Sequence, residues 1–166
     1  MLKRILYRLI KMLRPVIRMV ADQADLKLNY PHTSLGNHAL IFEDKPEVYI
    51  HNIPKSAIFN TRSGKITVGK NTVFGEDVMI LTGKHNYISE ITSIDQLQKV
   101  PESGRDIIIG EGCYIGSGVI VIGPVNIGDY AVLGAGSVVT KDVDGRALYG
   151  GIPAKKIKDL IPKYEK

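Results

Sequence analysis

The sequence predicts an all-β chain whose central part is a parallel β-helix, and three observations support this. Residues 109–144 form six consecutive six-residue repeats, each of which begins with an aliphatic residue. Glycine follows this first residue in four of the six repeats, and the fifth residue of every repeat is small or β-branched. A period of six matches neither the 3.6 of an α-helix nor the 2 of a plain strand, and it is typical of stacked β-coils. The aliphatic residues that begin the six consecutive hexads are Ile109, Ile115, Val121, Ile127, Leu133 and Val139.

Three hexads complete one triangular coil, so residues eighteen positions apart are expected to stack. This predicts Ile109 under Ile127 and Ile115 under Leu133, with Val121 under Val139 as the third pair. Glycine beside the inward residue fits a turn that needs either a positive φ or close backbone approach.

The composition indicates one globular domain. The 166 residues are 44% hydrophobic and 23% charged, which is ordinary for a soluble protein. A single cysteine excludes an internal disulfide framework and suits a reducing, cytoplasmic location. The sequence shows no apolar run long enough to cross a membrane. The net charge of +5 favours an anionic ligand, but no nucleic-acid-binding pattern is present, so we expect no nucleic-acid partner.

Residues 1–20 form a separate block with six basic residues and no acidic residue. Their apolar residues follow a helical stripe, which predicts a basic amphipathic helix. One interpretation is that this helix covers the open end of the β-helix or packs on a neighbouring subunit. The alternative is a peripheral contact with anionic lipid at the inner membrane face.

The rest of the chain divides into three segments. Residues 21–56 are irregular and are expected to form the first, imperfect coils. Residues 57–145 form the β-helix, interrupted by a polar insertion at 86–105 that we expect to be functional. Residues 146–166 are expected to form a turn and a short capping helix, with Ile157, Leu160 and Ile161 on its apolar face.

Four segments together resemble the hexapeptide-repeat acyltransferases, in particular galactoside-type, maltose-type and polysaccharide sugar O-acetyltransferases. They are TGKHN (82–86), IGEGCYIGSGVIV (109–121), IGDYAVLGAGSVVTKDV (127–143) and GGIPAKKI (150–157). The resemblance implies a left-handed parallel β-helix and a homotrimer with active sites at the subunit interfaces. It also implies acetyl-CoA as the donor and a hydroxyl of a sugar or glycan precursor as the acceptor.

The resemblance assigns roles to two residues at the acceptor side of the site. His85 occupies the position of the catalytic histidine in T-G-x-H, where a neutral imidazole can remove the acceptor's proton near pH 7. Asn60 matches an asparagine that orients the acceptor hydroxyl, or it is an asparagine stacked in a turn. His32, His38 and His51 lie outside any matching motif.

A second set of residues matches positions that hold the cofactor. Ser117 corresponds to the residue whose backbone N–H lies near the thioester carbonyl, where it could stabilise an oxyanion. Tyr114 replaces a common tryptophan and could pack on the pantetheine arm. The remaining positions are Ala135, Thr140 and Lys141 in the cofactor groove, and Lys155 and Lys158 near the nucleotide phosphates, where a lysine acts as a point charge. The alternative for these last lysines is a solvated face.

Cys113 is expected to be a small buried side chain rather than a nucleophile, so we expect direct transfer in a ternary complex. N-acetylation of an amino sugar and a non-catalytic trimeric scaffold remain alternatives. A metal site would need three convergent histidines, and only His85 lies in a regular coil, so no metal is expected.

Overall fold

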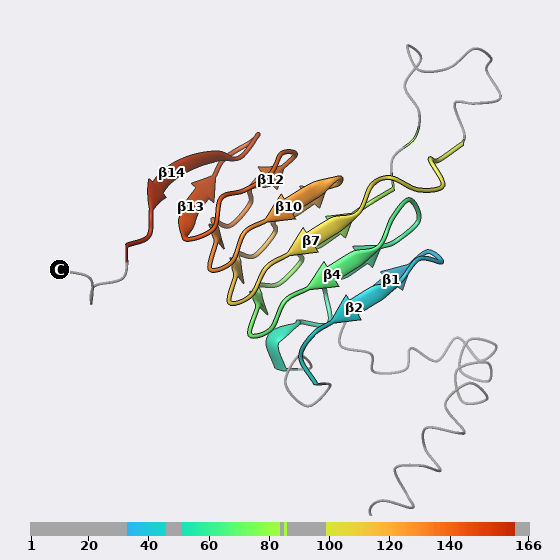
Figure 1. The fold of residues 1–166 in the computed structure, drawn as a ribbon, viewed down its shortest axis with the longest axis horizontal. Helices are drawn as coiled ribbons and strands as arrows, with labels where there is room; N and C mark the ends of the chain where they lie inside the picture. The colour runs from blue at the N-terminus through green and yellow to red at the C-terminus, as the bar shows by residue number, and fades with distance from the viewer. Residues whose placement is uncertain (1–32, 46–50, 84, 86–98, 162–166) are drawn as a thin grey trace, which may run out of the picture. The chain divides into compact units, whose positions relative to one another are not determined.

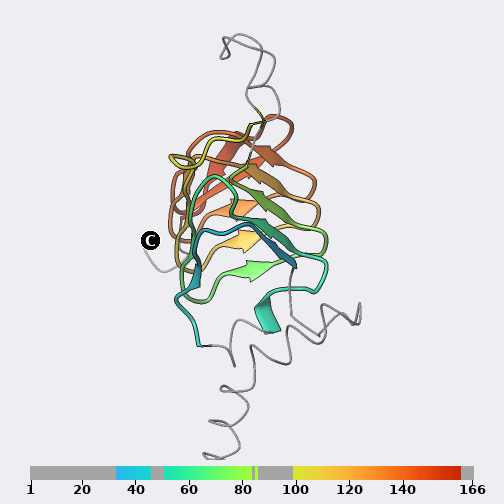
Figure 2. The same ribbon diagram turned by 90° about the vertical axis from the view of Figure 1, so that its right-hand side faces the viewer.

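The computed structural model describes residues 33–45, 51–83, 85 and 99–161. Over these residues the chain winds through short strands into stacked coils, so that segments far apart in sequence lie side by side (Figures 1 and 2). The pairings between coils are all parallel, except for one antiparallel pair at the C-terminal end. The arrangement is consistent with the left-handed parallel β-helix that the resemblance implies.

Three sheets form the sides of the coils. Sheet A contains β1 (Thr33–Leu35), β3 (Ile58–Asn60), β6 (Met79–Leu81), β9 (Ile120–Ile122) and β12 (Val138–Val139). Sheet B contains β2 (Leu40–Phe42), β4 (Ile66–Val68), β7 (Ile107–Ile109) and β10 (Val125–Ile127). Sheet C contains β5 (Val73–Phe74), β8 (Tyr114–Ile115), β11 (Val132–Leu133), β13 (Ala147–Gly150) and β14 (Lys155–Asp159).

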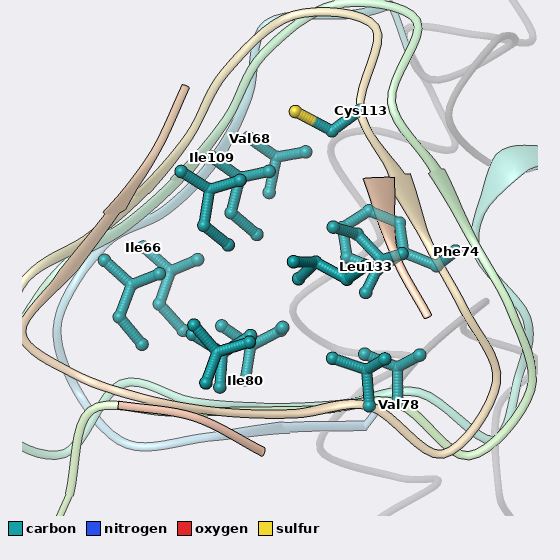
Figure 3. Packing of buried hydrophobic residues seen from close by; sticks show 14 of the residues in the cluster. Ile66, Val68, Phe74, Val78, Ile80, Ile109, Cys113 and Leu133 are labelled. Carbon is teal, nitrogen blue, oxygen red and sulfur yellow. The ribbon is translucent and has the colours of Figure 1, made fainter. Parts of the chain in front are cut away.

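The predicted stacking of aliphatic residues is confirmed. Ile109 pairs with Ile127 in sheet B, Ile115 pairs with Leu133 in sheet C, and the third predicted pair is formed in sheet A. All six side chains are buried, and Figure 3 shows Ile109 and Leu133 pointing into the coil from different sides. All the fifth-position residues are also buried, including Cys113 at 1% exposure.

Glycine has two different roles in the turns, close backbone approach at one position and a positive φ at another. The second-position Gly116 faces the next coil so closely that a Cβ there would lie 2.7 Å from the backbone nitrogen of Ala135. The fourth position instead takes the left-handed conformation, as at Gly112 with φ +63°. The same conformation occurs at Asn71 and, unusually for a bulky side chain, at Tyr130. Close approach therefore explains the second-position glycines from Gly69 to Gly128, and backbone conformation explains the fourth-position glycines.

The predicted C-terminal capping helix is wrong over the residues described. Lys155–Asp159 forms β14, which pairs antiparallel with β13 at the edge of sheet C. A helix of this length has little intrinsic stability, whereas the open edge of β13 offers ladder partners to the returning chain. The predicted N-terminal helix, residues 1–20, lies outside the described residues. Within the described part, the chain contains no helix with the length and apolar character of a membrane span.

Candidate functional site

The coils create three corners, and each corner collects a different set of residues. Along the chain, β4, β5 and β6 pass through sheets B, C and A in that order, and the next coils repeat it. The C–A corner holds the turns after β5, β8 and β11. The A–B corner holds the segments after β6, β9 and β12. The B–C corner holds the turns after β4, β7 and β10.

His85 lies four residues after the end of β6, in the segment that follows β6 at the A–B corner, and it is exposed. Asn60 lies beside the same segment, because β3 pairs with β6 in sheet A and sets Asn60 opposite Leu81. A Cβ built on Gly83 would lie 3.2 Å from Oδ1 of Asn60, so the Asn60 amide borders the chain two residues before His85. The backbone N–H of Arg62 donates to the same Oδ1 at 3.0 Å, which fixes the amide's orientation. The structure therefore brings the two predicted acceptor-side residues to one corner.

Thr82 anchors this segment. Its side chain is fully buried, and its Oγ1 donates to the carbonyl of Asn60 at 2.7 Å and accepts from the N–H of Ser63 at 3.1 Å. Its own carbonyl accepts a hydrogen bond from Nε of Arg105 at 2.6 Å. Arg105 was not among the predicted site residues, because in sequence it belongs to the polar insertion.

Ser117 and Ala135 lie together at the C–A corner, in adjacent coils. The N–H of Gly136 donates to the carbonyl of Ser117 at 2.9 Å, and Gly116 allows the two turns to approach. Both Ser117 and Ala135 are exposed. The Ser117 hydroxyl accepts from the N–H of Glu76 at 3.2 Å, which ties this turn to the coil before it.

Tyr114 and Lys158 belong to one ladder across sheet C. Tyr114 pairs with Val132, which pairs with Leu148, and Leu148 pairs with Lys158. Tyr114 is 52% exposed, on the outer surface of the sheet. Three strand spacings separate it from Lys158, about 14 Å at 4.8 Å per strand.

The three lysines of β14 differ in whether they have an acidic partner. Lys156 forms ion pairs with Asp144 at 3.1 Å and with Asp159 at 2.6 Å. Hydrogen bonds from Lys156 and Tyr149 lower the pKa of the Asp144 carboxyl. In the part of the chain that the structure describes, Lys155 and Lys158 have no such acidic partner. Their charges are therefore available to an anion.

Thr140 and Lys141 follow β12, so they lie at the A–B corner with His85 and not with Ser117. Both are exposed. Two groups of predicted site residues thus lie on opposite edges of sheet A, while the remaining ones, Tyr114, Lys155 and Lys158, lie on sheet C.

A pocket of about 460 Å³ lies at the B–C corner, away from both groups. Lys158 is the one predicted site residue that lines it. The Arg146 guanidinium packs over the Tyr130 ring at 5.3 Å from its centre, and both residues line the pocket. The negative charge of Glu111 raises the pKa of the Tyr130 hydroxyl. No sequence signal marked Arg146, because it follows the last regular hexad.

Cys113 points into the core, and burial raises the pKa of its thiol. Its Sγ donates to the carbonyl of Gly128 at 3.3 Å. Among the described residues, no three His, Cys, Asp or Glu side chains are grouped as metal ligands.

Residues 106–141 match the model of the bacterial transferase hexapeptide (six repeats). This segment is therefore similar to the hexapeptide-repeat transferases. It is 32% identical over 95 residues to the galactoside O-acetyltransferase of Escherichia coli K12, covering 57% of this chain and 44% of the relative. It is 28% identical over 143 residues to an E. coli K12 protein named for acetyl transfer in colanic acid biosynthesis, covering 86% and 67%.

Solved structures share the fold. A maltose O-acetyltransferase from Clostridium difficile 630 aligns with a TM-score of 0.51 and 28% identity, covering 78% of this chain and 70% of that one. A hexapeptide-repeat acetyltransferase from Vibrio cholerae, complexed with acetyl coenzyme A, aligns with a TM-score of 0.51 and 22% identity, covering 78% and 72%. The similar proteins are thus acetyltransferases by name, and the match to the galactoside enzyme covers less than half of that enzyme's length.

Proposed function

We propose that this hexapeptide-repeat chain transfers an acetyl group from acetyl-CoA to a hydroxyl of a sugar or glycan precursor, with His85 as the general base. The observation that carries the proposal lies at the A–B corner, where Gly83 of the TGKH motif borders Asn60, two residues before His85. Relatives named as galactoside and colanic acid acetyltransferases support the reaction class and the acceptor class.

In the proposed reaction, the neutral His85 imidazole removes the proton of the acceptor hydroxyl as its oxygen attacks the acetyl carbonyl. The backbone N–H of Ser117 would stabilise the negative charge on that carbonyl oxygen. The new C–O bond forms and the C–S bond breaks, and the His85 imidazolium returns the proton to the departing thiolate. Asn60 orients the acceptor. Buried Cys113 takes no part, so the transfer is direct.

The residues on sheet C fit a phosphate-bearing donor with a long apolar arm. Tyr114 offers an exposed ring, and Gly116 keeps the Ser117 turn close to the next coil. Lys155 and Lys158 lack acidic partners among the described residues and would attract phosphate groups. Acetyl-CoA would supply the activated thioester when bound.

The separation of the two groups supports an assembly with sites between chains. One hexad across sheet A separates Ser117 from the A–B corner, on the order of 15–20 Å at the rise of a β-strand. Reacting atoms must come within about 3–3.5 Å, so His85 and Ser117 of one chain are too far apart to serve one thioester. We therefore infer that His85 of one subunit works with Ser117 of a neighbour, as in the homotrimer that the resemblance implies.

The outer surface of sheet A is suited to that contact. It carries two half-buried columns in register along the strands, and almost every member is apolar. A continuous apolar face of this kind usually marks an association surface. The columns consist of Ile58, Met79, Ile120 and Val138, and of Asn60, Leu81 and Ile122.

The activity is tested by thiol release from acetyl-CoA with a panel of sugars and amino sugars. His85→Ala should lower kcat by about 10²–10⁴-fold, whereas the exposed His51→Ala, a matched control, should not change it. Full activity of His85→Ala would reject His85 as the base. Faster turnover of amines than of hydroxyl acceptors would indicate N-acetylation, and absence of both turnover and coenzyme binding would indicate a scaffold.

The assembly is tested by light scattering. Ile120→Glu places a charge in the apolar face of sheet A and should yield monomers. Ile108→Glu, on the outer surface of sheet B, should remain a trimer. A trimeric Ile120→Glu variant would show that sheet A does not form the contact.

A further inference from the structure

The polar insertion leaves the β-helix after β6 and returns to it at β7, and one hydrogen bond joins the two ends. Thr82 is the first residue after β6, and Arg105 precedes β7 by two residues. Nε of Arg105 donates to the Thr82 carbonyl at 2.6 Å, a short, charge-assisted hydrogen bond. We call Thr82, Ser63 and Arg105 the neck.

The Arg105 side of the neck is held by backbone contacts in two coils. The N–H of Arg105 donates to the carbonyl of Ser63 at 3.2 Å in the coil before it. A Cβ on Gly64 would lie 2.6 Å from the Arg105 carbonyl carbon, and one on Gly123 would lie 2.6 Å from its carbonyl oxygen. The backbone of Arg105 therefore lies close to two glycines, and a side chain at either glycine would clash with it.

The Thr82 side of the neck is held by the coil before it. Two bonds join Thr82 to the Asn60 carbonyl, from its N–H at 3.0 Å and from its Oγ1 at 2.7 Å. His85 follows three residues later and is exposed. The guanidinium of Arg105 thus contacts a backbone carbonyl three residues before His85.

We propose that Arg105 is a positioning residue for His85: its guanidinium fixes the Thr82 carbonyl and so sets where the histidine segment leaves the coil. This inference rests on the proposed function, because it assigns the effect to the histidine that acts as base. Two contacts then pre-organise the acceptor-side pair: Asn60 borders Gly83, and Arg105 binds the carbonyl of the preceding Thr82. Pre-organisation of this kind raises the reaction rate, because a misplacement of about 1 Å can lower that rate 10²-fold.

The kinetic test compares Arg105→Gln with wild type. Arg105→Gln should lower kcat by about 10–100-fold and leave the KM for acetyl-CoA unchanged, since the neck does not include the donor-side residues. Arg105→Lys should recover part of the loss, because a lysine keeps the charge but lacks the planar guanidinium. Lys65→Gln is the matched control, because it removes an exposed cation from the coil that contacts Arg105, and it should leave kcat unchanged.

A double-mutant cycle separates positioning of His85 from a general structural role. In a His85→Ala background, Arg105→Gln should change kcat by less than about 2-fold, since the residue that it positions is absent. An equal loss in both backgrounds would overturn the proposal. So would an unchanged kcat in Arg105→Gln.

Hydrogen exchange of the segment 82–85 supplies a readout that does not need turnover. Arg105→Gln should speed exchange at Thr82 and Gly83 while leaving β12 protected, and Arg105→Lys should give an intermediate rate. Unchanged exchange at 82–85, or faster exchange throughout β12, would overturn the neck's role. If wild type turns over no acceptor in the panel, the proposed function fails, and this exchange measurement still decides whether Arg105 holds the segment. Arg105→Lys serves both assays if Arg105→Gln does not fold.

Discussion

Two adjacent isoleucines on β7 provide a direct test of the coil geometry. Ile109 is 1% exposed and stacks between Val68 and Ile127, whereas Ile108 is 46% exposed on the outer surface of the same strand. Ile109→Ala removes three carbons, a transfer loss of about 2.4 kcal/mol at 0.8 kcal/mol each. The ladders hold both neighbours in place, so the unfilled volume adds about 1–2 kcal/mol. We expect a total loss of about 4 kcal/mol.

Ile108→Ala is the matched control. About half of this side chain already contacts solvent and no cavity forms, so the expected loss is about 1 kcal/mol. Urea unfolding, followed by far-ultraviolet circular dichroism, measures both variants at one protein concentration, because association would make stability concentration-dependent. Equal losses, or a larger loss for Ile108→Ala, would refute the assignment of inward and outward positions.

Three further predictions concern the turns, the cysteine and the C-terminal strand. Gly116→Ala should cost more than Gly136→Ala in urea unfolding, because the first Cβ meets backbone at 2.7 Å, whereas the second meets nothing within 4 Å and adds only the left-handed strain, about 1–2 kcal/mol. Cys113→Ala should keep kcat, and the wild-type thiol should react with a disulfide reagent at pH 8 only after denaturation, because burial raises its pKa; rapid native labelling would contradict this. The lowered pKa of Asp144 means that its charge stabilises the fold above its ordinary pKa, about 3.9, and that this stabilisation is lost as the pH falls through the lower folded value. Asp144→Asn should therefore destabilise the protein more at pH 7 than at pH 3, and equal effects at both would argue against the Lys156 contact.

The six-residue period was sufficient to predict the core, since it identified Ile115 under Leu133 without any structure. Inward packing repeats with the chain, so sequence spacing alone determines it. The C-terminal strand was not predictable in this way. Ile157, Leu160 and Ile161 have helical spacing, but the open edge of β13 determined the conformation of Lys155–Asp159. Local spacing carries no information about an edge formed by residues earlier in the chain.

The sequence predicted which residues belong to the candidate site, but it did not predict where they lie relative to one another. The motif around His85 was readable, and the pairing of β3 with β6 then set Asn60 beside it. The two-corner distribution of His85 and Ser117 depends on which sheet each hexad enters, and this follows only from the count of coils on both sides of the insertion. Arg105 carried no motif, because its role arises from a carbonyl 23 positions away in the chain.

The ladders on both sides of the insertion continue as if nothing had been inserted: Val68 pairs with Ile109 across it, and Leu81 pairs with Ile122 in the following coil. The inward side chains therefore keep their columns across this corner, whatever chain lies between β6 and β7. We expect sequence changes confined to the insertion to leave the packing of the framework as it is.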